Sequence, residues 1–358
     1  MSSQPATQPL DEAKLQNFLG KVVTDFGAAL SSTLVYIGQQ HGLYKAMVEA
    51  GPVTPAELAE RTGTIERYVR EWLINQAAGG YVEYDAASGR YHLPPEQAVA
   101  LTDESSPFYV GGGFYVVKAM SNALPRISAA FQQGGGLLWG DNDPDLFVGV
   151  ERFFRPGYAM HLVNSWIPAL TGVEEKLKAG AQVADVGCGH GASTIIMAQA
   201  YPNARFYGYD NHAASIETAR QRAEAAGVSD RVRFEVADAR SFPAEGYDLI
   251  AFFDCLHDMG DPVGAAKRAH ETLAADGSVM IVEPMAGTCV EENINIIGRV
   301  FSAASTLCCT ANSLALGGPA LGAVATDDAL RDVVTQGGFT QFRRATETPF
   351  NRIFEARH

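Results

Sequence analysis

The C-terminal half of the chain alternates short apolar runs with segments of helical periodicity. The apolar runs lie at 183–186, 203–210, 232–238, 247–254 and 277–283, and the helical segments between them lie at 192–198, 213–226 and 263–275. Short apolar runs separated by helical segments are typical of βαβ units, whose strands form a parallel sheet. We therefore predict an α/β fold over 171–358, a doubly wound sheet with its ligand site at the carboxyl ends of the strands.

The N-terminal part of the chain has a different pattern, in which helical signals precede a hairpin. The segment 54–57 reads Thr-Pro-Ala-Glu, a helix start with a capping threonine, a proline in the first turn and a glutamate at the capping-box position. A second helix is predicted to bury one stripe of side chains, and two short alternating runs follow at 79–84 and 89–93. The stripe consists of Ile65, Tyr68, Val69, Trp72 and Leu73. Helix, turn, helix and hairpin predict a winged helix-turn-helix.

Charge changes how this N-terminal module is interpreted. The chain has 27 basic and 41 acidic residues, and residues 1–110 alone contain seven basic and thirteen acidic residues. A DNA-binding module needs a positive patch for phosphate contacts. In the second helix Arg67 and Arg70 stand beside Glu66 and Glu71, so their charges cancel. We expect no nucleic-acid partner, and a structural or dimerising role for the module.

Length and segment boundaries divide the chain into four regions. At 358 residues the chain exceeds the size at which one hydrophobic core usually keeps growing. We expect a disordered tail at 1–11, a winged-helix domain at 12–105, a helical linker at 106–170 and the sheet domain at 171–358. The tail lacks the basic start and apolar centre of a signal peptide, and no apolar run approaches the length of a membrane span. These features predict a cytoplasmic protein without a membrane partner.

The five cysteines agree with that compartment. Their number is odd and their spacing implies no disulfide framework, which is typical of reduced thiols. The adjacent pair Cys308-Cys309 could bind a soft metal or metalloid together with Cys255 and Cys289, but the spacing matches no standard zinc site. Buried apolar thiols are the favoured interpretation, and we predict no metal.

The strongest chemical signal is a glycine turn between a predicted strand and a predicted helix. Gly187, Gly189 and Gly191 alternate along this turn. Only glycine combines a positive φ with close approach of the backbone to a ligand, and the helix that follows directs its N-terminus toward that ligand. The turn therefore predicts a bound ligand of nucleotide type.

Four acids narrow the identity of that ligand. Asp185 lies within the strand before the turn, and Asp210, Asp238 and Asp254 come where the next three strands end. Carboxyl ends of parallel strands meet at one edge of a sheet, so the four side chains are expected to gather there. A carboxylate at Asp185 would repel a pyrophosphate but can pair with an ammonium group, which argues against a dinucleotide.

This combination resembles the class I S-adenosylmethionine-dependent methyltransferases, whose first motif is acid-x-Gly-x-Gly-x-Gly. The resemblance extends from about residue 175 to the C-terminus. It implies a Rossmann-like sheet whose last strands, at 339–343 and 351–356, include one antiparallel strand. It also implies the cofactor S-adenosylmethionine and the product S-adenosylhomocysteine. The matching cofactor residues are Asp185, Gly187, Cys188 and Gly189 under the methionine part, Asp210 with Asn211 at the ribose, Asp238 with Ala239 at the adenine, and Asp254 with Cys255 near the sulfonium.

The winged helix in front of such a domain resembles small-molecule methyltransferases of plants and of bacterial secondary metabolism. An actinobacterial group is similar in the segment 64–73 and in the glycine turn. This resemblance implies a homodimer formed partly by the N-terminal domain, and a small-molecule acceptor. Dispersed side chains at 108–166 and 290–325 would form the acceptor pocket.

His257 is the candidate catalytic base. His257-Asp258 matches the His-Asp pair that follows the fourth strand in small-molecule O-methyltransferases, where the histidine deprotonates the acceptor hydroxyl. A neutral hydroxyl is a poor nucleophile, and an imidazole can take its proton as the methyl group moves. Glu283 matches a glutamate that orients this histidine. The family's second orienting glutamate is absent, and Asp327 or Asp328 could replace it.

Three alternatives stay open. His257 could contribute shape only, since some N-methyltransferases need no base and rely on positioning. The same fold and cofactor could serve hydroxylation or decarboxylation. The chain could also be a regulator in which a ligand controls DNA binding by the winged helix.

Overall fold

The computed structural model describes residues 10–358 and divides into two compact units, one ending at Val117 and the other beginning at Lys118. The tail predicted at 1–11 lies mostly outside the described residues, and Asp11 caps the first helix through a hydrogen bond from the Lys14 N–H at 3.1 Å. The boundary between the units falls within helix α6 (Gly112–Gln133).

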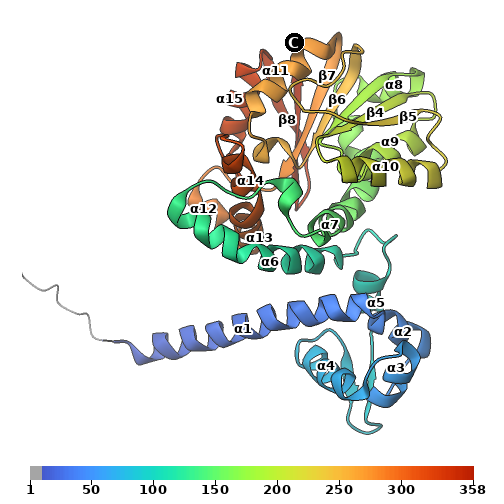
Figure 1. Ribbon diagram of the computed structural model, residues 1–358, viewed down its shortest axis with the longest axis vertical. Helices are drawn as coiled ribbons and strands as arrows, with labels where there is room; N and C mark the ends of the chain where they lie inside the picture. Colours follow the sequence, from blue (N-terminus) through green and yellow to red (C-terminus); the bar gives the residue numbers. More distant parts are fainter. Residues whose placement is uncertain (1–9) are drawn as a thin grey trace, which may run out of the picture. The chain divides into compact units, whose positions relative to one another are not determined.

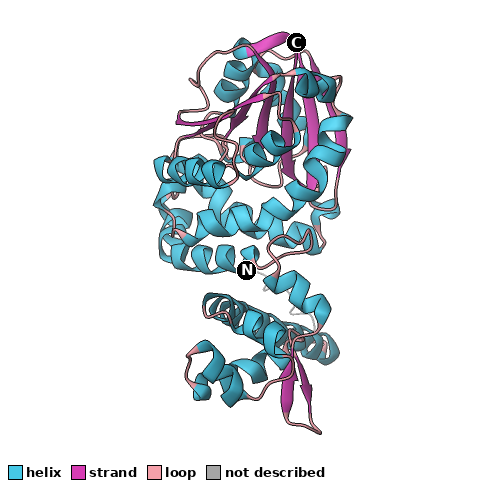
Figure 2. Ribbon diagram, turned by 90° about the vertical axis from the view of Figure 1, so that its right-hand side faces the viewer, coloured by secondary structure: helices cyan, strands magenta, loops and turns pink. Residues whose placement is uncertain are grey.

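The first unit is mainly helical and carries a small hairpin (Figures 1 and 2). Its elements are α1 (Glu12–Gln40), α2 (Leu43–Ala50), α3 (Pro55–Thr62), α4 (Glu66–Ala78), β1 (Glu83–Asp85), β2 (Arg90–His92) and α5 (Pro95–Thr102). The predicted capping box starts α3, because Thr54 accepts a bond from the Glu57 N–H while Glu57 accepts one from the Thr54 N–H. Helix, turn, helix and hairpin are confirmed.

Two details of this unit correct the sequence prediction. Val69, Trp72 and Leu73 of α4 are buried, but Ile65 and Tyr68 are 65% and 79% exposed. The helical spacing was right, yet α4 is a short helix whose first turn lies beyond the core formed by α1, α2 and α3. The two ion pairs on its exposed side are present, Arg67 with Glu71 and Arg70 with Glu66.

Helix α1 also differs from what the sequence analysis predicted, namely that no segment approaches the length of a membrane span. It runs for 29 residues and extends away from α2–α4 in Figure 1. An 18-residue window reaches a mean hydropathy of 1.2, so by length and composition alone α1 could cross a membrane. Scattered polar residues break up the apolar runs in the sequence and conceal this property. Large apolar side chains are exposed along the helix, namely Leu15, Phe18, Leu19, Val23, Phe26, Leu30 and Ile37.

The second unit is a seven-stranded sheet with helices on both faces (Figures 1 and 2). Its strands are β3 (Gln182–Val186), β4 (Arg205–Asp210), β5 (Val232–Val236), β6 (Tyr247–Phe253), β7 (Leu273–Pro284), β8 (Gln341–Glu347) and β9 (Asn351–Arg357). They are ordered β5-β4-β3-β6-β7-β9-β8. All neighbours from β5 to β7 are parallel, and β9 is antiparallel to both β7 and β8. The predicted doubly wound sheet with one antiparallel strand is confirmed.

Two cores hold the helices against the sheet. On one face α7 (Asp145–His161), α8 (Val173–Ala179), α9 (Ala192–Ala200) and α10 (Ala213–Ala225) contribute to a core that includes Val183. On the other face α11 (Pro262–Thr272) and α15 (Asp327–Gln336) pack on a core that includes Ala184. Successive strand residues point to opposite faces, so Asp185 points, like Val183, toward α9.

Short helices complete the unit. These are η1 (Trp139–Asp141), η2 (Leu162–Trp166), η3 (Ile167–Ala169), η4 (Leu256–Asp258), α12 (Val290–Asn293), α13 (Ile296–Ala304), η5 (Ser305–Cys309) and α14 (Thr310–Ala315). Two of them, η2 and η5, are π-helical. This conformation is rare in proteins overall but is often found at functional sites. The segment η4 directly follows β6 at the carboxyl edge of the sheet.

Candidate active site

The glycine turn after β3 has the positive φ values that the sequence predicts. Gly187, Gly189 and Gly191 have φ values of 80°, 51° and 79°. A Cβ at Gly187 would meet the Cys255 sulfur at 2.7 Å, whereas a Cβ at Gly189 would meet nothing within 4 Å. Gly187 is therefore required by packing, and Gly189 borders open space where a ligand can approach the backbone.

Asp185 is fully buried under this turn. Its Oδ2 accepts hydrogen bonds of 2.6 Å from the hydroxyls of Ser193 and Thr194, at the start of α9. Its Oδ1 is buried and lacks a hydrogen-bond partner in the described part of the chain. Burial raises the pKa of Asp185 to about 6. The free oxygen leaves this buried carboxylate able to accept one further hydrogen bond.

Asp210 ties the end of β4 to the same turn. Its Oδ2 accepts from the Gly189 N–H at 2.9 Å and its Oδ1 accepts from the His212 N–H at 2.8 Å. Burial raises its pKa. Asn211 follows on the exposed side, and Cys188 is buried in the core. Asp210 thus fixes the turn and presents acidic oxygens beside Gly189.

Asp254 ends β6 in a conformation that is unusual for a residue with a side chain. Its φ is 51°, one of two positive values among non-glycine residues of 10–358. Its Oδ2 accepts from the Tyr158 hydroxyl at 2.8 Å, and its Oδ1 accepts from the Asn351 amide at 2.9 Å. Burial raises its pKa to about 7. Sequence reasoning missed Tyr158 and Asn351, because both come from distant segments that only the fold brings together.

Cys255 links this strand end to the glycine turn. Its thiol donates to the Val186 carbonyl at 3.3 Å. Burial raises the pKa of the thiol, and so do the charges of Asp258, Glu283, Asp185 and Asp210. Cys255 therefore connects the glycine turn to the segment that carries His257.

His257 and Glu283 form a buried pair. The Nδ1 atom of His257 lies 2.5 Å from Oε2 of Glu283, and the two side chains are 3% and 1% exposed. Burial is the largest single effect on His257 and would lower its pKa, but the charge and the hydrogen bond of Glu283 together with the other neighbouring groups outweigh it, and the pKa lies well above the ordinary value of 6.5. The predicted partnership of His257 with Glu283 is present in the structure.

The turn that carries His257 is fixed by hydrogen bonds from the chain beyond β7. The Gly322 N–H donates to the His257 carbonyl at 3.1 Å, and the Asn312 amide donates to the Asp258 carbonyl at 3.0 Å. The Ser313 hydroxyl donates to the Met259 carbonyl at 2.9 Å. Unlike Glu283, the Asp258 side chain makes no hydrogen bond to His257 in the described part of the chain. Burial raises the pKa of Asp258 to about 7.

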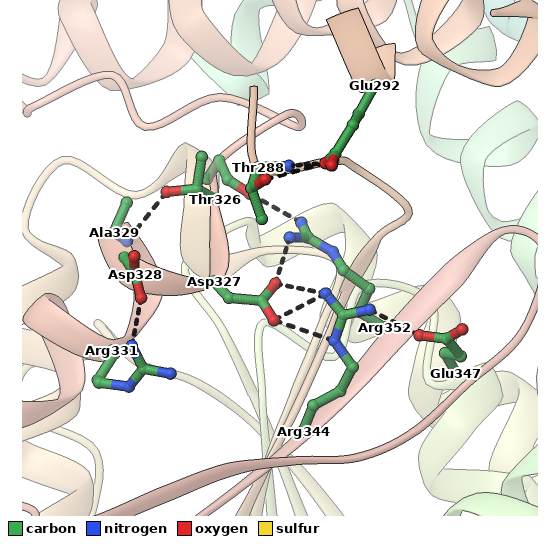
Figure 3. Close-up of polar contacts among 12 residues, drawn as sticks. Thr288, Glu292, Thr326, Asp327, Asp328, Ala329, Arg331, Arg344, Glu347 and Arg352 are labelled. Atoms are coloured by element: carbon green, nitrogen blue, oxygen red, sulfur yellow. Dashed lines mark hydrogen bonds and ion pairs between the residues drawn. The ribbon is translucent and has the colours of Figure 1, made fainter. Parts of the chain in front are cut away.

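Asp327 and Asp328 pair with arginines (Figure 3), and neither is hydrogen-bonded to His257 in the described part of the chain, which corrects that part of the sequence prediction. Asp327 accepts from Arg352 at 2.8 Å and from Arg344 at 2.7 Å. Asp328 is exposed and pairs with Arg331. Arg352 is fully buried, and its remaining N–H groups bind the Pro284 and Ala325 carbonyls. The negative charge of Asp327 thus compensates the positive charge of the buried Arg352.

Asp238 lies at the same sheet edge, beyond β5, but is more open than the other acids. Its carboxylate pairs side-on with Arg240, at 2.9 Å from Nε and 2.8 Å from Nη2. This pair lowers the pKa of Asp238. Ala239 packs against the core beside it. The pairing of Asp238 with Arg240 is a contact that the sequence prediction did not include.

The cysteines are all free thiols, and no group of three or more His, Cys, Asp or Glu side chains within 10–358 is arranged to hold a metal ion. Cys289 is exposed, whereas Cys308 is buried. The alternative of a soft-metal site at Cys308-Cys309 therefore finds no ligand set in the described chain.

Two family models match the chain. Residues 28–103 match a Rv2258c-like winged HTH domain, and residues 177–325 match a methyltransferase domain. The chain therefore carries a methyltransferase domain preceded by a winged helix-turn-helix domain.

Curated relatives match part of the chain. A trans-aconitate 2-methyltransferase from Streptomyces avermitilis is 36% identical over 128 residues, which are 36% of this chain and 48% of that protein. A 27-O-demethylrifamycin SV methyltransferase from Amycolatopsis mediterranei is 34% identical over 107 residues, 29% of this chain and 39% of that protein. The chain thus spans about half the length or less of these relatives.

Solved structures match nearly the whole chain at low identity. The mitomycin 7-O-methyltransferase has a TM-score of 0.72 at 19% identity. The match covers 97% of this chain and 100% of the mitomycin enzyme's chain. Human N-acetylserotonin methyltransferase, in complex with S-adenosylmethionine, has a TM-score of 0.67 at 16% identity, with coverages of 98% and 99%. These likenesses establish the class I methyltransferase fold with an N-terminal winged-helix domain.

Proposed function

We propose that this chain, which joins a Rv2258c-like winged HTH domain to a methyltransferase domain, is an S-adenosylmethionine-dependent methyltransferase acting on a small-molecule acceptor. One observation carries the proposal. The buried pair of His257 and Glu283 lies next to the glycine turn, because Cys255, two residues before His257, donates its thiol to the carbonyl of Val186 at the start of that turn. A base held beside a cofactor turn is the arrangement that methylation of a hydroxyl requires.

The residues at the turn fit the proposed cofactor. S-adenosylmethionine supplies an electrophilic methyl group on a positively charged sulfonium. Asp185 keeps a buried, unpartnered oxygen, and Gly189 leaves open space next to Asp210. Asp185, Gly187, Cys188 and Gly189 would hold the amino-acid part, Asp210 and Asn211 the ribose, Asp238 and Ala239 the adenine, and Asp254 and Cys255 the region of the sulfonium.

His257 would take the proton from an acceptor hydroxyl. Glu283 engages Nδ1, so the other ring nitrogen, Nε2, is the one available to the acceptor. The carboxylate orients the ring and stabilises the imidazolium that forms when the proton arrives. Burial of both side chains keeps water from competing for this proton. We therefore favour O-methylation over N-methylation, which can proceed without a base.

The N-terminal domain would dimerise the enzyme instead of binding DNA. The arginines on the exposed side of α4 are paired with glutamates of the same helix, so they offer no positive patch to phosphates. Helix α1 exposes apolar side chains along most of its length, which in a stable protein are usually covered by a partner. We infer that a second copy of the chain covers α1 and that the dimer is a cytoplasmic protein.

Calorimetric titration with S-adenosylhomocysteine tests the cofactor site without knowledge of the acceptor. We expect one molecule bound per chain, and an Asp185→Asn variant that binds about tenfold or more weakly because a buried charge partner is lost. Asp248→Asn is the matched control, since Asp248 lies on β6 and contacts the Gln182 backbone away from the turn. Absence of binding by the wild-type chain would contradict the proposal.

A further inference from the structure

Asn312 on α14 joins the turn that carries the proposed base to a second part of the site. Its side chain is 7% exposed, and both ends of its amide are engaged. Nδ2 donates to the Asp258 carbonyl at 3.0 Å, and Oδ1 accepts from the Trp139 N–H at 2.8 Å. An amide satisfies both of these partners, whereas a carboxylate of the same shape can only accept. Both bonds therefore depend on the amide at this position.

Trp139 belongs to a strap, residues 134–144, that connects α6 to α7. The strap lies directly on α14. The Leu137 N–H donates to the Ala311 carbonyl at 3.1 Å, and a Cβ at Gly136 would collide with the same oxygen. Glycine at this position thus allows the close approach of the two backbones. These contacts keep the Trp139 N–H within reach of the Asn312 side chain.

The strap also reaches the loop of Asp210, the acid proposed to bind the ribose. The Trp139 ring packs edge-on against Phe147 of α7, with the ring centroids 5.4 Å apart, and Phe147 packs on His212 at 4.5 Å. A Cβ at Gly140 would lie 3.4 Å from the His212 ring. The His212 N–H in turn donates to Asp210 Oδ1 at 2.8 Å. A continuous series of contacts therefore runs from the ribose acid through the strap to the turn of the base.

We propose that Asn312 is a positioning residue that couples cofactor binding at Asp210 to the position of His257. This inference rests on the proposed function. A ligand held at Asp210 restrains the loop of His212, and the ring contacts extend this restraint to the strap. The Trp139 N–H extends it to Asn312, whose other hydrogen bond ends on the carbonyl of the residue after His257. The base is therefore held most firmly when the cofactor is bound.

Ser313, the next residue of α14, holds the same turn without the strap. Its side chain is fully buried, and its hydroxyl donates to the Met259 carbonyl at 2.9 Å. The same hydroxyl accepts from the Ala320 N–H at 3.0 Å, so both of these partners lie outside residues 134–144. Ser313→Ala therefore removes a bond from the neighbouring carbonyl while the strap stays attached to Asn312. This makes Ser313→Ala the matched control for the Asn312 variants.

Turnover gives one test of the coupling, through a double-mutant cycle. Trp139→Ala removes the ring contact with Phe147 and Asn312→Leu removes both amide bonds, so each variant interrupts the same connection. Each should lower kcat by about threefold to tenfold, the value of one hydrogen bond, with little change in acceptor KM. The double variant should be no slower than the slower single variant. Trp139→Ala combined with Ser313→Ala should instead multiply the two losses, and multiplied losses in both pairs would overturn the inference.

Hydrogen exchange of the full chain, measured with and without S-adenosylhomocysteine, tests the coupling without an acceptor. In the wild type we expect the ligand to slow exchange both in the strap and in the turn at 256–260. Asn312→Asp keeps an acceptor for the Trp139 N–H but loses the donor to Asp258. The strap should therefore still respond, while the slowing at the turn should shrink by about twofold to tenfold, the value of one hydrogen bond. Ser313→Ala should keep the ligand-induced slowing at both places.

Asn312→Leu covers the case in which the buried charge of Asn312→Asp unfolds the chain. It is neutral and similar in size, and the slowing at the turn should be lost in it as well. A wild-type turn that does not respond to the bound ligand would overturn the inference, as would equal slowing in wild type and both Asn312 variants or its loss in Ser313→Ala. Failure of the proposed function would look different, because the wild type would then bind no S-adenosylhomocysteine, and the inference would fall with it.

Discussion

The Nδ1 atom of His257 lies 2.5 Å from Oε2 of Glu283, although 26 positions separate the two residues. The sheet explains this closeness. Strands β6 and β7 are parallel, and the last pair of residues in their register joins Phe253 to Val282. Glu283 follows Val282 directly, and the short turn η4 returns His257 over it. The register of β6 and β7 thus brings together His257 and Glu283, the two residues on which the proposed chemistry depends.

The first prediction concerns the pH dependence of turnover. Only the neutral imidazole accepts a proton, so kcat/KM should rise with pH through a pKa above 6.5, the direction in which Glu283 shifts His257. In Glu283→Gln the carboxylate charge is lost, so this inflection should move to lower pH while kcat falls. Glu355→Gln is the control, because Glu355 is a buried carboxylate that binds Thr171 and Ser278 elsewhere in the fold. If Glu283→Gln kept the wild-type inflection, the coupling of the two residues would be wrong.

Cofactor binding should release protons. Burial raises the pKa of Asp254 and Asp258 to about 7, so both carboxyls are partly protonated at neutral pH. A sulfonium cation nearby favours the carboxylates and lowers these pKa values. Calorimetry of S-adenosylmethionine binding in buffers of different ionisation enthalpy should show this release. S-adenosylhomocysteine, which lacks the sulfonium charge, should release fewer protons, and equal release would contradict the placement of Asp254.

The same carboxyls predict how the ligand-free protein responds to pH. Their folded pKa values lie above those of the unfolded chain, so their contribution to stability is largest at low pH and is lost as pH rises through about 7. The raised pKa of His257 acts in the same direction. Thermal unfolding should therefore occur at a higher temperature at pH 6 than at pH 8. Asp258→Asn should reduce this difference, and a Tm that increases with pH would show that other groups dominate.

Helix α1 leads to a prediction about assembly. Phe26 lies at the centre of its exposed apolar stripe and is 64% exposed. If a second copy covers α1, as we propose, Phe26→Glu should convert the dimer into a monomer in light scattering coupled to gel filtration. Asn17→Glu is the matched control, since it adds the same charge to an exposed polar position of the same helix. A wild-type chain that is monomeric, or that sediments with lipid vesicles, would exclude the second copy as the occupant of this face.

The sequence was sufficient for features that depend on local periodicity and on glycine. The strands, the glycine turn and the acids at the strand ends could be predicted, because period-2 and period-3.6 patterns fix which residues reach the carboxyl edge. The sequence could not reveal contacts between distant segments. The hydrogen bond of Tyr158 to Asp254 and the pairing of Asp327 with Arg352 depend on tertiary packing that no local pattern encodes.

The most direct test of the whole account is the stoichiometry of turnover with a small-molecule acceptor. Using S-adenosylmethionine labelled on its methyl carbon, we predict one S-adenosylhomocysteine formed for each labelled acceptor, and a His257→Ala variant that is slower by about 10²–10⁴-fold. An acceptor that is converted while S-adenosylmethionine stays intact would contradict methyl transfer. Full activity of His257→Ala across pH would contradict the role of the base.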